Sequence, residues 1–413
     1  MVYSNNAVCT IVSKNYFAYA RTLYNSIICH NPDLQFVVLL VDENDDVLDL
    51  AQEPFLVLEV SNLNIPNFKQ AAFKFDIIEL NTNVKPSFLK YLLKNMGFLK
   101  VLYLDPDILL YHALSEVLDC LSISNIVLTP HCTSPINDDL KPTEQDFLQS
   151  GTFNLGFIGL SNSQETIRFL DWWEQRCLTL GFVELQTGLF VDQKWVNLVP
   201  CFFEGVLILK HLGYNMAYWN LHERVIKCVD GQWIVNDKWP LVFFHFSGIV
   251  FNDQTQISHH QTRFNFSLRP DLLIIFREYH DLLSENGLEA CLNYSYKYSK
   301  FSNSVTITHL ARRMYSVNEG LFQETNPFDS EGLIYTWCKN EGYLSSNNDY
   351  SKFLSETYCG SDIRIRMINF LLRVILKVFG SNRYTLLMKY CSYISVLRNQ
   401  EFKKEILFKN TSH

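Results

Sequence analysis

The segment that most constrains the fold reads KVLYLDPDILL and runs from Lys100 to Leu110. Its apolar and aromatic residues predict a buried strand that stops where two aspartates flank a proline. Pro106 has no backbone N–H to donate, so the strand ends or bends there. Asp105 and Asp107 are therefore expected at the carboxyl end of a strand, where open α/β sheets bind their ligands. Two carboxylates this close suit a hard divalent cation, which often shares its ligands with substrate phosphates. An acidic turn after a strand has the same pattern, so both interpretations stay open here.

Length and composition indicate a globular protein. The chain has 413 residues, of which 48% are hydrophobic, enough for one large domain and an appendage. The cysteines form no C-x-x-C pair and lie within apolar runs, as expected of reduced thiols in a cytoplasmic protein. No signal peptide and no transmembrane segment is expected from the sequence.

Charge is distributed unevenly along the chain. The net charge is −8, yet residues 361–413 are strongly basic, so the remainder is more acidic still. An acidic body argues against nucleic acid as a partner. The segment Ile363 to Phe379 (IRIRMINFLLRVILKVF) predicts a basic amphipathic helix. Such a helix would either contact an anionic membrane surface at the inner face of the plasma membrane or pack on the catalytic domain.

Strand and helix patterns alternate over the first part of the chain. Strands are expected at 7–13, 34–41, 55–60, 101–104, 126–130, 151–160 and 241–248, and helices at 17–29, 45–52, 73–93 (interrupted at Lys85-Pro86) and 164–177. This alternation predicts an α/β fold with a doubly wound, mostly parallel sheet. No glycine-rich phosphate-binding motif follows the first strand. The phosphates of a bound nucleotide would therefore be neutralised by the metal that the two aspartates imply.

Several polar residues later in the chain stand out against apolar surroundings. Residues 131–149 form a polar segment expected to be a loop that closes over a site. Asn154 lies within an apolar strand, where a buried amide needs partners. Asp192-Gln193 is a second polar pair of this kind. His245 ends a strand, either as a satisfied core residue or as a third ligand for the cation.

Five motifs in order give the sequence a resemblance to a known family. They are YLDPDI, FNLGFI, FVDQ, YWNLHER and FHFSG, and Asn15-Tyr16 follows the first strand. Residues 5–265 resemble GT-A fold glycosyltransferases, most closely the retaining family-8 enzymes that use UDP-galactose or UDP-glucose, and bacterial glycosyltransferases of surface-glycan synthesis. The resemblance implies a GT-A fold, Rossmann-like with a mostly parallel sheet flanked by helices. Residues 1–265 would be the catalytic domain, and 266–413 a mainly helical C-terminal region.

The resemblance also implies roles for individual residues. Asp105, Asp107 and His245 would hold Mn²⁺ or Mg²⁺ on the diphosphate of a UDP-sugar. Asn15 and Tyr16 would contact the uracil, and Lys85 would lie near the sugar or phosphate. Asn154 would hydrogen-bond a sugar, Asp192 would bind donor hydroxyls, and Gln193 would face the anomeric carbon opposite the departing UDP. The expected nucleotide-sugar contacts are Thr10, Ser13, Asn15, Tyr16, Lys85, Asp105 and Gly248.

Two positions depart from the family pattern. Ser13 stands where some members have an acidic residue that binds the uracil N3–H. Phe251 falls near the place of a lysine that pairs with the β-phosphate. By hypothesis Arg224 or Arg263 replaces that lysine, since a guanidinium binds phosphate bidentately.

The expected reaction transfers a hexose to a glycan, lipid-linked or protein acceptor, such as a growing lipopolysaccharide. Retention fits a site without an obvious general base, whereas an inverting enzyme would need a carboxylate such as Glu144 or Asp146. A phosphatase with an aspartyl-phosphate is a weaker alternative, because its D-x-D pattern usually lies on the first strand. A non-catalytic protein that binds nucleotide sugars on the same fold is the other alternative.

Overall fold

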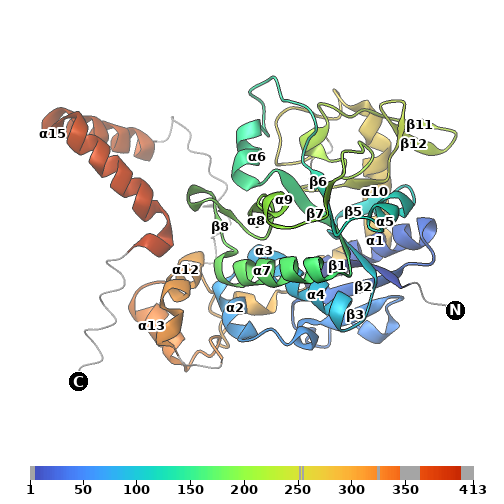
Figure 1. The fold of residues 1–413 in the computed structure, drawn as a ribbon. Helices are drawn as coiled ribbons and strands as arrows, with labels where there is room; N and C mark the ends of the chain where they lie inside the picture. The colour runs from blue at the N-terminus through green and yellow to red at the C-terminus, as the bar shows by residue number, and fades with distance from the viewer. Residues whose placement is uncertain (1–4, 251–252, 254, 323–325, 345–362, 401–413) are drawn as a thin grey trace. The chain divides into compact units, whose positions relative to one another are not determined.

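The structure is a computed structural model, and it describes residues 5–250, 253, 255–322, 326–344 and 363–400 (Figure 1). The chain forms two compact units. The first comprises Met1–Phe68 and Ile77–Lys297, and the second comprises Lys69–Asp76 and Tyr298–His413. The predicted division at residue 265 does not coincide with this boundary, and which residues suffice for catalysis stays a prediction.

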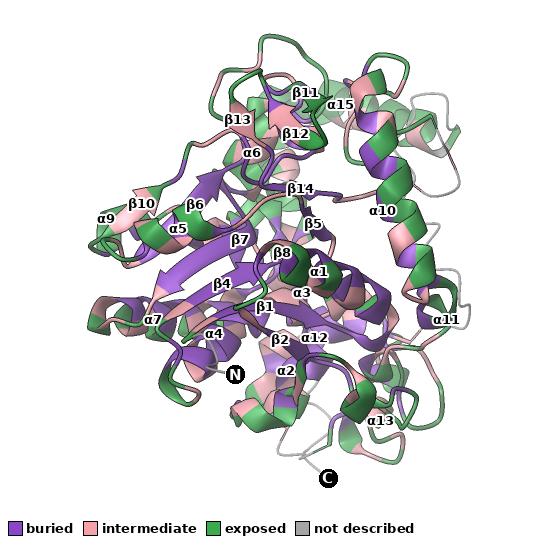
Figure 2. Cartoon of the chain, turned by 90° about the vertical axis from the view of Figure 1, so that its right-hand side faces the viewer, coloured by how far each residue is buried: buried purple, intermediate pink, exposed green. Residues whose placement is uncertain are grey.

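A seven-stranded sheet forms the centre of the first unit, in the order β10-β6-β7-β4-β1-β2-β3. Its strands are β1 (Asn6–Val12), β2 (Gln35–Leu40), β3 (Leu56–Glu59), β4 (Lys100–Leu104), β6 (Ile126–Pro130), β7 (Phe153–Ser161) and β10 (Val206–Ile208). Neighbouring strands run parallel except at β7, which is antiparallel to both β4 and β6. The inner strands are buried at nearly every position (Figure 2), as expected when helices cover both faces of a sheet. The predicted mostly parallel α/β architecture is confirmed.

Helices surround this sheet (Figure 1). They are α1 (Phe17–His30), α3 (Ile77–Asn83), α4 (Lys85–Lys94), α5 (Ser115–Cys120), α6 (Glu144–Ser150), α7 (Gln164–Leu180), α8 (Gln193–Val196), α9 (Val199–Phe202), α10 (Leu273–Glu285) and α11 (Leu288–Leu292). Helix α7 confirms the predicted helix at 164–177, and the Ser163 hydroxyl caps it by accepting a hydrogen bond from the Thr166 amide. The largest apolar core contains residues of β1, β2, β4, α1 and α10.

A short antiparallel pair lies beside the central sheet and brings distant parts of the chain together. Strand β5 (Ile108–Leu110) pairs with β14 (Phe243–His245), with Ile108 opposite His245. The remaining strands of the first unit form small antiparallel sheets: β8 (Val183–Glu184) with β9 (Leu189–Phe190), and β11 (Ile226–Val229) with β12 (Gln232–Val235) and β13 (Trp239–Pro240). The β5–β14 pair places the end of the YLDPDI motif next to FHFSG.

Three local predictions differ from the structure. The helix expected at 45–52 is reduced to one 3₁₀ turn, Leu50–Gln52, because Asp45 and Asp46 adopt left-handed backbone conformations (φ 52° and 57°) that a right-handed helix excludes. The loop expected at 131–149 ends in helix α6. The helical stretch expected at 73–93 is divided among α2 (Phe68–Lys74), α3 and α4, and Pro86 lies in the first turn of α4.

The second unit is helical where it is described. It contains most of α2, with α12 (His309–Asn318), α13 (Leu333–Asn340) and α15 (Ile363–Ser395). Phe73 and Tyr315 belong to its apolar core. Helix α15 bends at Gly380 and exposes most of its apolar side chains. None of the described helices combines the length and the apolar character needed to cross a bilayer. The predicted helical C-terminal region is confirmed.

Candidate active site

Three of the predicted site residues meet at the carboxyl end of β4. The Nε2 atom of His245 lies 2.9 Å from Asp107 Oδ1 and 3.8 Å from Asp105 Oδ2. One ligand atom from each of the three side chains falls within 4.8 Å of the other two. His245 is buried, while both carboxylates are partly exposed. The predicted proximity of these side chains is confirmed, and their role as metal ligands stays a prediction.

Backbone contacts fix the two aspartates. The Asp105 amide donates to the Gly156 carbonyl at 2.8 Å, which continues the β4–β7 ladder by one residue. The Tyr103 hydroxyl donates to Asp105 Oδ1 at 2.6 Å. The Asp107 carbonyl accepts from the amide of Phe246 at 2.8 Å, and Phe246 directly follows His245 in the sequence. Asp105 Oδ1 is thus held by Tyr103, while Oδ2 faces His245.

The His245 ring fits into a space that the chain leaves by omitting a side chain. A Cβ on Gly156 would lie 2.3 Å from His245 Cε1 and 2.8 Å from Nδ1. Trp219 packs edge-on against the other side of the ring, with centroids 5.1 Å apart. Burial alone lowers the pKa of His245, but the carboxylates of Asp107 and Asp105 outweigh it and raise that pKa above its usual value.

The donor set fits a divalent cation. Carboxylate oxygens suit Mg²⁺, Ca²⁺ and Mn²⁺, and an imidazole nitrogen suits transition ions, so two carboxylates with one imidazole fit Mn²⁺ well. A mutual separation within 4.8 Å allows all three ligand atoms to reach one ion. The cluster also lies at the edge of the sheet where α/β folds bind substrates.

Lys85 and Asp192 form a buried ion pair. Lys85 Nζ lies 2.7 Å from Asp192 Oδ2, and each side chain is 2% exposed. The ammonium also donates to the Leu155 carbonyl at 2.9 Å and lies 4.3 Å from the centroid of the Tyr103 ring. Burial raises the pKa of Asp192, and Lys85 opposes that shift. The structure therefore places these two predicted residues in contact with each other. Tyr103 connects them to the candidate metal site, because its ring lies against the Lys85 ammonium and its hydroxyl donates to Asp105.

Gln193 and Asn154 are engaged within the protein. Gln193 Oε1 accepts from the Leu155 amide at 3.0 Å, and its Nε2 donates to the Ser150 carbonyl at 3.1 Å. Asn154 Oδ1 accepts from the Gly156 amide at 3.1 Å. Both side chains are buried. These hydrogen bonds tie both side chains to the backbone around β7, and their predicted roles at the sugar stay predictions.

The predicted nucleotide side follows β1. Tyr16 is 39% exposed and stacks on Tyr19 with centroids 4.6 Å apart. Burial, then Asp107 and Asp105, raise the pKa of Tyr16, so its ring lies within the electrostatic field of the carboxylate pair. The Ser13 hydroxyl donates to Asn15 Oδ1 at 2.7 Å.

Thr10 and Gly248 are predicted contacts that lie deeper. Thr10 is fully buried within β1, and its hydroxyl has no hydrogen-bond partner among the described residues. Gly248 has a φ of +67°, and a Cβ there would lie 2.4 Å from the His260 ring and 2.7 Å from the Ser258 hydroxyl. The glycine therefore lets the segment after His245 turn tightly against His260.

Neither proposed replacement for the missing lysine is available. Arg224 donates to the Leu212 and Tyr214 carbonyls and pairs with Glu223. Arg263 pairs with Asp138 and donates to backbone carbonyls of the 140–142 segment. Phe251, which takes the position of that lysine, lies outside the described residues. The hypothesis that either arginine binds the phosphate therefore finds no support in its contacts.

Sequence reasoning missed Asn215, which lies fully buried next to the cluster. Its Oδ1 is 3.2 Å from His245 Nδ1, and its Nδ2 donates to Asn154 Oδ1 and Thr129 Oγ1, each at 3.0 Å. The signal was present, because Asn215 is a lone amide between apolar residues, the pattern that singled out Asn154. It was overlooked because it precedes the YWNLHER motif.

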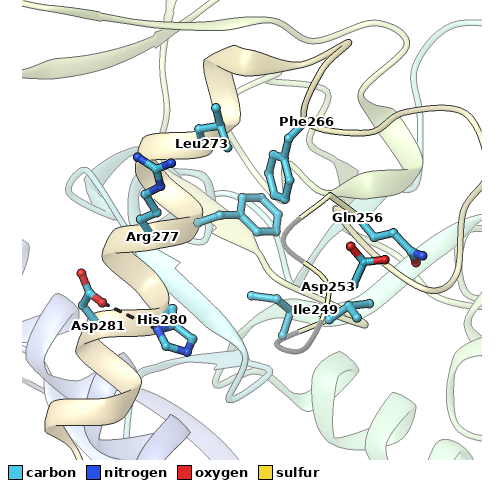
Figure 3. Close-up of a pocket in the computed structure, with 10 residues that line it drawn as sticks. Ile249, Asp253, Gln256, Phe266, Leu273, Arg277, His280 and Asp281 are labelled. Carbon is cyan, nitrogen blue, oxygen red and sulfur yellow. Dashed lines mark ion pairs between the residues drawn. The ribbon is translucent and has the colours of Figure 1, made fainter.

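A separate cavity of about 430 Å³ lies beyond the segment that follows His245 (Figure 3). Ile249, Phe266 and Leu273 give it an apolar lining, and Arg277 extends from α10 beside the His280–Asp281 pair. None of the predicted site residues lines this cavity.

The chain is similar to a bacterial protein and, distantly, to several solved structures. No family model matches it. It is 27% identical over 293 residues to the uncharacterized protein YfnF of Bacillus subtilis (strain 168), covering 67% of this chain and 91% of that protein. Among solved structures it is similar to the galactosyltransferase LgtC in complex with donor and acceptor sugar analogs (16% identity, TM-score 0.40, 68% of this chain and 95% of that one). It is also similar to the glycosyltransferase GlyE of Streptococcus pneumoniae TIGR4 (16% identity, TM-score 0.41, 76% and 73%).

Proposed function

We propose that this protein is a metal-dependent GT-A glycosyltransferase that moves a hexose from a UDP-sugar to an acceptor hydroxyl with retention. The observation that carries the proposal is the Asp105–Asp107–His245 cluster beside the exposed Tyr16 ring. A cation site and an aromatic platform at the same sheet edge are what a nucleoside diphosphate needs. The order of the sequence motifs supports the same class.

Asp105, Asp107 and His245 would hold Mn²⁺, or Mg²⁺ in its place. When bound, such a cation stabilises the negative charge that develops on the diphosphate as the sugar leaves. Tyr103 and Gly156 keep the Asp105 carboxylate in place for this task. Tyr16 would stack on the uracil, and its partner Tyr19 supports the ring from the protein side.

The Lys85–Asp192 pair would line the sugar side of the site. Lys85 neutralises the buried carboxylate and holds it in one orientation, which suits a residue that accepts hydrogen bonds from donor hydroxyls. Gln193 and Asn154, tied to the backbone of β7, would form a preorganised wall rather than mobile ligands.

Retention is favoured because the carboxylates that inversion would need are engaged elsewhere. Glu144 Oε1 accepts from the Ile136 amide at 3.2 Å. Asp146 caps α6 through the Thr143 amide and hydroxyl. In a retaining reaction the acceptor hydroxyl attacks from the face of the departing UDP, and the diphosphate oxygen receives its proton. No side-chain base is required for that transfer.

The acceptor is proposed to be carried at a membrane surface. Helix α15 exposes apolar side chains such as Ile363, Phe370 and Val378, which are 72%, 66% and 67% exposed. Basic side chains are interspersed with them along the helix. A helix of this kind binds in the plane of an anionic lipid interface, which would bring the enzyme to a lipid-linked glycan.

The decisive test is hydrolysis of UDP-galactose and UDP-glucose by the full-length protein, with and without Mn²⁺. The unmodified protein should release UDP only with the metal. Asp107→Ala should lose at least about a hundredfold of that rate, because a charge-stabilising group is removed. Asp33→Ala, at an exposed aspartate outside the predicted site segments, is the matched control and should retain full activity.

The alternative of a non-catalytic binder predicts a different result. A UDP-sugar would then raise the melting temperature of the protein by mass action, yet neither the unmodified protein nor Asp33→Ala would release UDP. Equal hydrolysis by Asp107→Ala and the unmodified protein would contradict the proposed site.

A further inference from the structure

Four buried polar side chains form a continuous hydrogen-bonded chain behind the candidate metal site. His131, Asn154, Asn215 and His245 are each at most 9% exposed. His131 Nε2 lies 3.4 Å from Asn154 Nδ2, Asn154 Oδ1 lies 3.0 Å from Asn215 Nδ2, and Asn215 Oδ1 lies 3.2 Å from His245 Nδ1. The four residues come from different parts of the sequence, so their alignment is a property of the fold.

A backbone amide fixes the direction of the hydrogen bonds at one point. Asn154 Oδ1 accepts from the N–H of Gly156, and an amide N–H is always a donor. The atom of Asn154 at this position is therefore the oxygen, and it must receive the second hydrogen bond from the NH₂ group of Asn215. The Asn215 oxygen then faces His245, so His245 Nδ1 must carry a proton.

A backbone carbonyl fixes the same direction at the other end. His131 Nδ1 lies 3.3 Å from the Thr152 carbonyl, which only accepts. Burial lowers the pKa of His131 to about 4, so the ring is neutral near pH 7 and its Nε2 accepts. That nitrogen receives an N–H of the Asn154 NH₂ group. The Gly156 amide and the Thr152 carbonyl thus independently require the same donor-to-acceptor direction along the four side chains.

We propose that Asn215 is a positioning residue that holds the His245 imidazole with a proton on Nδ1 and keeps Nε2 turned toward Asp105 and Asp107, where it offers its lone pair once a cation is bound. A histidine ligand needs such a partner on its second nitrogen, because that hydrogen bond sets both the tautomer and the ring orientation. The proposal rests on the proposed function only in taking Nε2 as a metal ligand. The protonation of Nδ1 follows from the protein's own hydrogen bonds.

The backbone of Asn215 permits a clean deletion of its side chain. Asn215 has a φ of +52°, a conformation that glycine adopts without strain. Asn215→Gly therefore removes the amide while sparing the turn. Asn215→Asp keeps an oxygen that accepts from His245 Nδ1, but it turns a second oxygen toward Asn154 Oδ1 in place of the NH₂ group. Thr129→Val is the control, because it removes one acceptor of Asn215 but leaves the Asn154 bond that sets the orientation.

Mn²⁺ binding to the full-length protein, followed by electron paramagnetic resonance, tests the role. Asn215→Gly should raise the dissociation constant about 10- to 100-fold, the usual cost of losing such a partner. Asn215→Asp, which keeps the acceptor for His245 Nδ1, should bind Mn²⁺ more tightly than Asn215→Gly, and Thr129→Val should stay within about threefold of the unmodified protein. Equal losses in all three variants would indicate a general packing role and overturn the proposal, as would an unchanged constant in Asn215→Gly.

Nitrogen-15 NMR of the His245 ring separates this proposal from the proposed function. The Nδ1 signal should be that of a protonated nitrogen, both without metal and with Mg²⁺, and His245→Gln assigns it. A lone pair on Nδ1 would refute the proposal whatever the enzyme does. If the protein bound no Mn²⁺ at all, the proposed function would fail, while the NMR result would still decide the tautomer.

Discussion

The absence of one side chain decides whether His245 can reach the two aspartates. Gly156 lies on β7, and its backbone carbonyl accepts from the Asp105 amide while its Cα faces the His245 ring. The same residue therefore holds one ligand and makes room for another. Its amide also sets the orientation of Asn154. Three features of the site depend on this position.

We expect Gly156→Ala to weaken Mn²⁺ binding by at least about tenfold, because the added methyl would displace the ring that carries the ligand nitrogen. Isothermal titration with Mn²⁺ measures the change. Gly320→Ala is the matched control, since a Cβ there meets no atom within 4 Å. An unchanged affinity in Gly156→Ala would show that the ring can shift without cost to the site.

At the scale of residues, the sequence predicted that Asp105, Asp107 and His245 lie together, but it did not predict the side chain that supports His245. Asp105 and Asp107 were recognisable because they flank a proline at the end of an apolar strand. His245 was recognisable because it lies at the end of another strand. Asn215 was not recognisable in this way. Its role depends on hydrogen bonds to Asn154 on β7 and to His245 on β14, and no local sequence pattern encodes these contacts. Asn154 was recognisable as a buried amide in need of partners, and the structure supplies those partners, while its predicted contact with a sugar stays a prediction.

At the scale of elements, one buried ion pair links α4 to α8. Lys85 begins α4, and Asp192 immediately precedes α8. Each charge is costly to bury alone, so the two elements depend on one another. The Leu155 carbonyl on β7 completes the coordination of the ammonium.

Lys85→Met should lower the free energy of unfolding by about 3–5 kcal/mol, because it leaves Asp192 buried without its partner. Burial already raises the pKa of Asp192. A raised pKa means that Asp192 binds a proton more readily in the folded protein than in the unfolded chain. The free energy of unfolding therefore falls as pH rises toward that raised pKa, because the buried carboxyl becomes charged. The defect should therefore be larger at pH 8 than at pH 5 in urea unfolding. The double variant Lys85→Met, Asp192→Asn should recover most of it, and equal defects in both variants would contradict the explanation.

Sequence patterns predicted the elements well where burial dominates and poorly where turns do. The strands of the central sheet were recognisable because they are apolar throughout. The helix expected at 45–52 fails because two consecutive aspartates take left-handed conformations, which their short polar side chains tolerate. Helix α6 was missed although Thr143 and Asp146 form its capping box, a start signal readable in the sequence.

At the scale of the whole molecule, charge separates the chain into an acidic body and a basic end. Arg366, Arg373 and Lys377 follow one another at spacings of seven and four residues, which places them on one stripe of α15, and all three are exposed. Apolar side chains occupy most of the remaining surface of this part of the helix. A narrow basic stripe on a largely apolar helix favours shallow insertion into an anionic lipid interface.

Replacing Arg366, Arg373 and Lys377 together by Gln should weaken binding to mixed phosphatidylglycerol and phosphatidylcholine vesicles by roughly a hundredfold, at about 1 kcal/mol for each charge. Flotation of the full-length protein measures this. A control with Lys69, Lys94 and Lys210 replaced by Gln, three exposed lysines elsewhere, should float like the unmodified protein. Binding to pure phosphatidylcholine should be weak in all cases. Equal flotation of both triple variants would remove the membrane from the proposal and leave α15 as a protein-contact helix.

The division of the chain into units has a consequence for the order in which it is synthesised. Residues 69–76 belong to the second unit although they lie within the sequence of the first. The Phe73 ring packs against Phe301 and Tyr315, and its carbonyl accepts from Arg312. On the ribosome this segment emerges long before its partners, so nascent chains carry an uncovered aromatic anchor until the last third is made. The C-terminal portion is therefore no detachable appendage, because ending translation at Lys297 would leave residues 69–76 without the rest of their core.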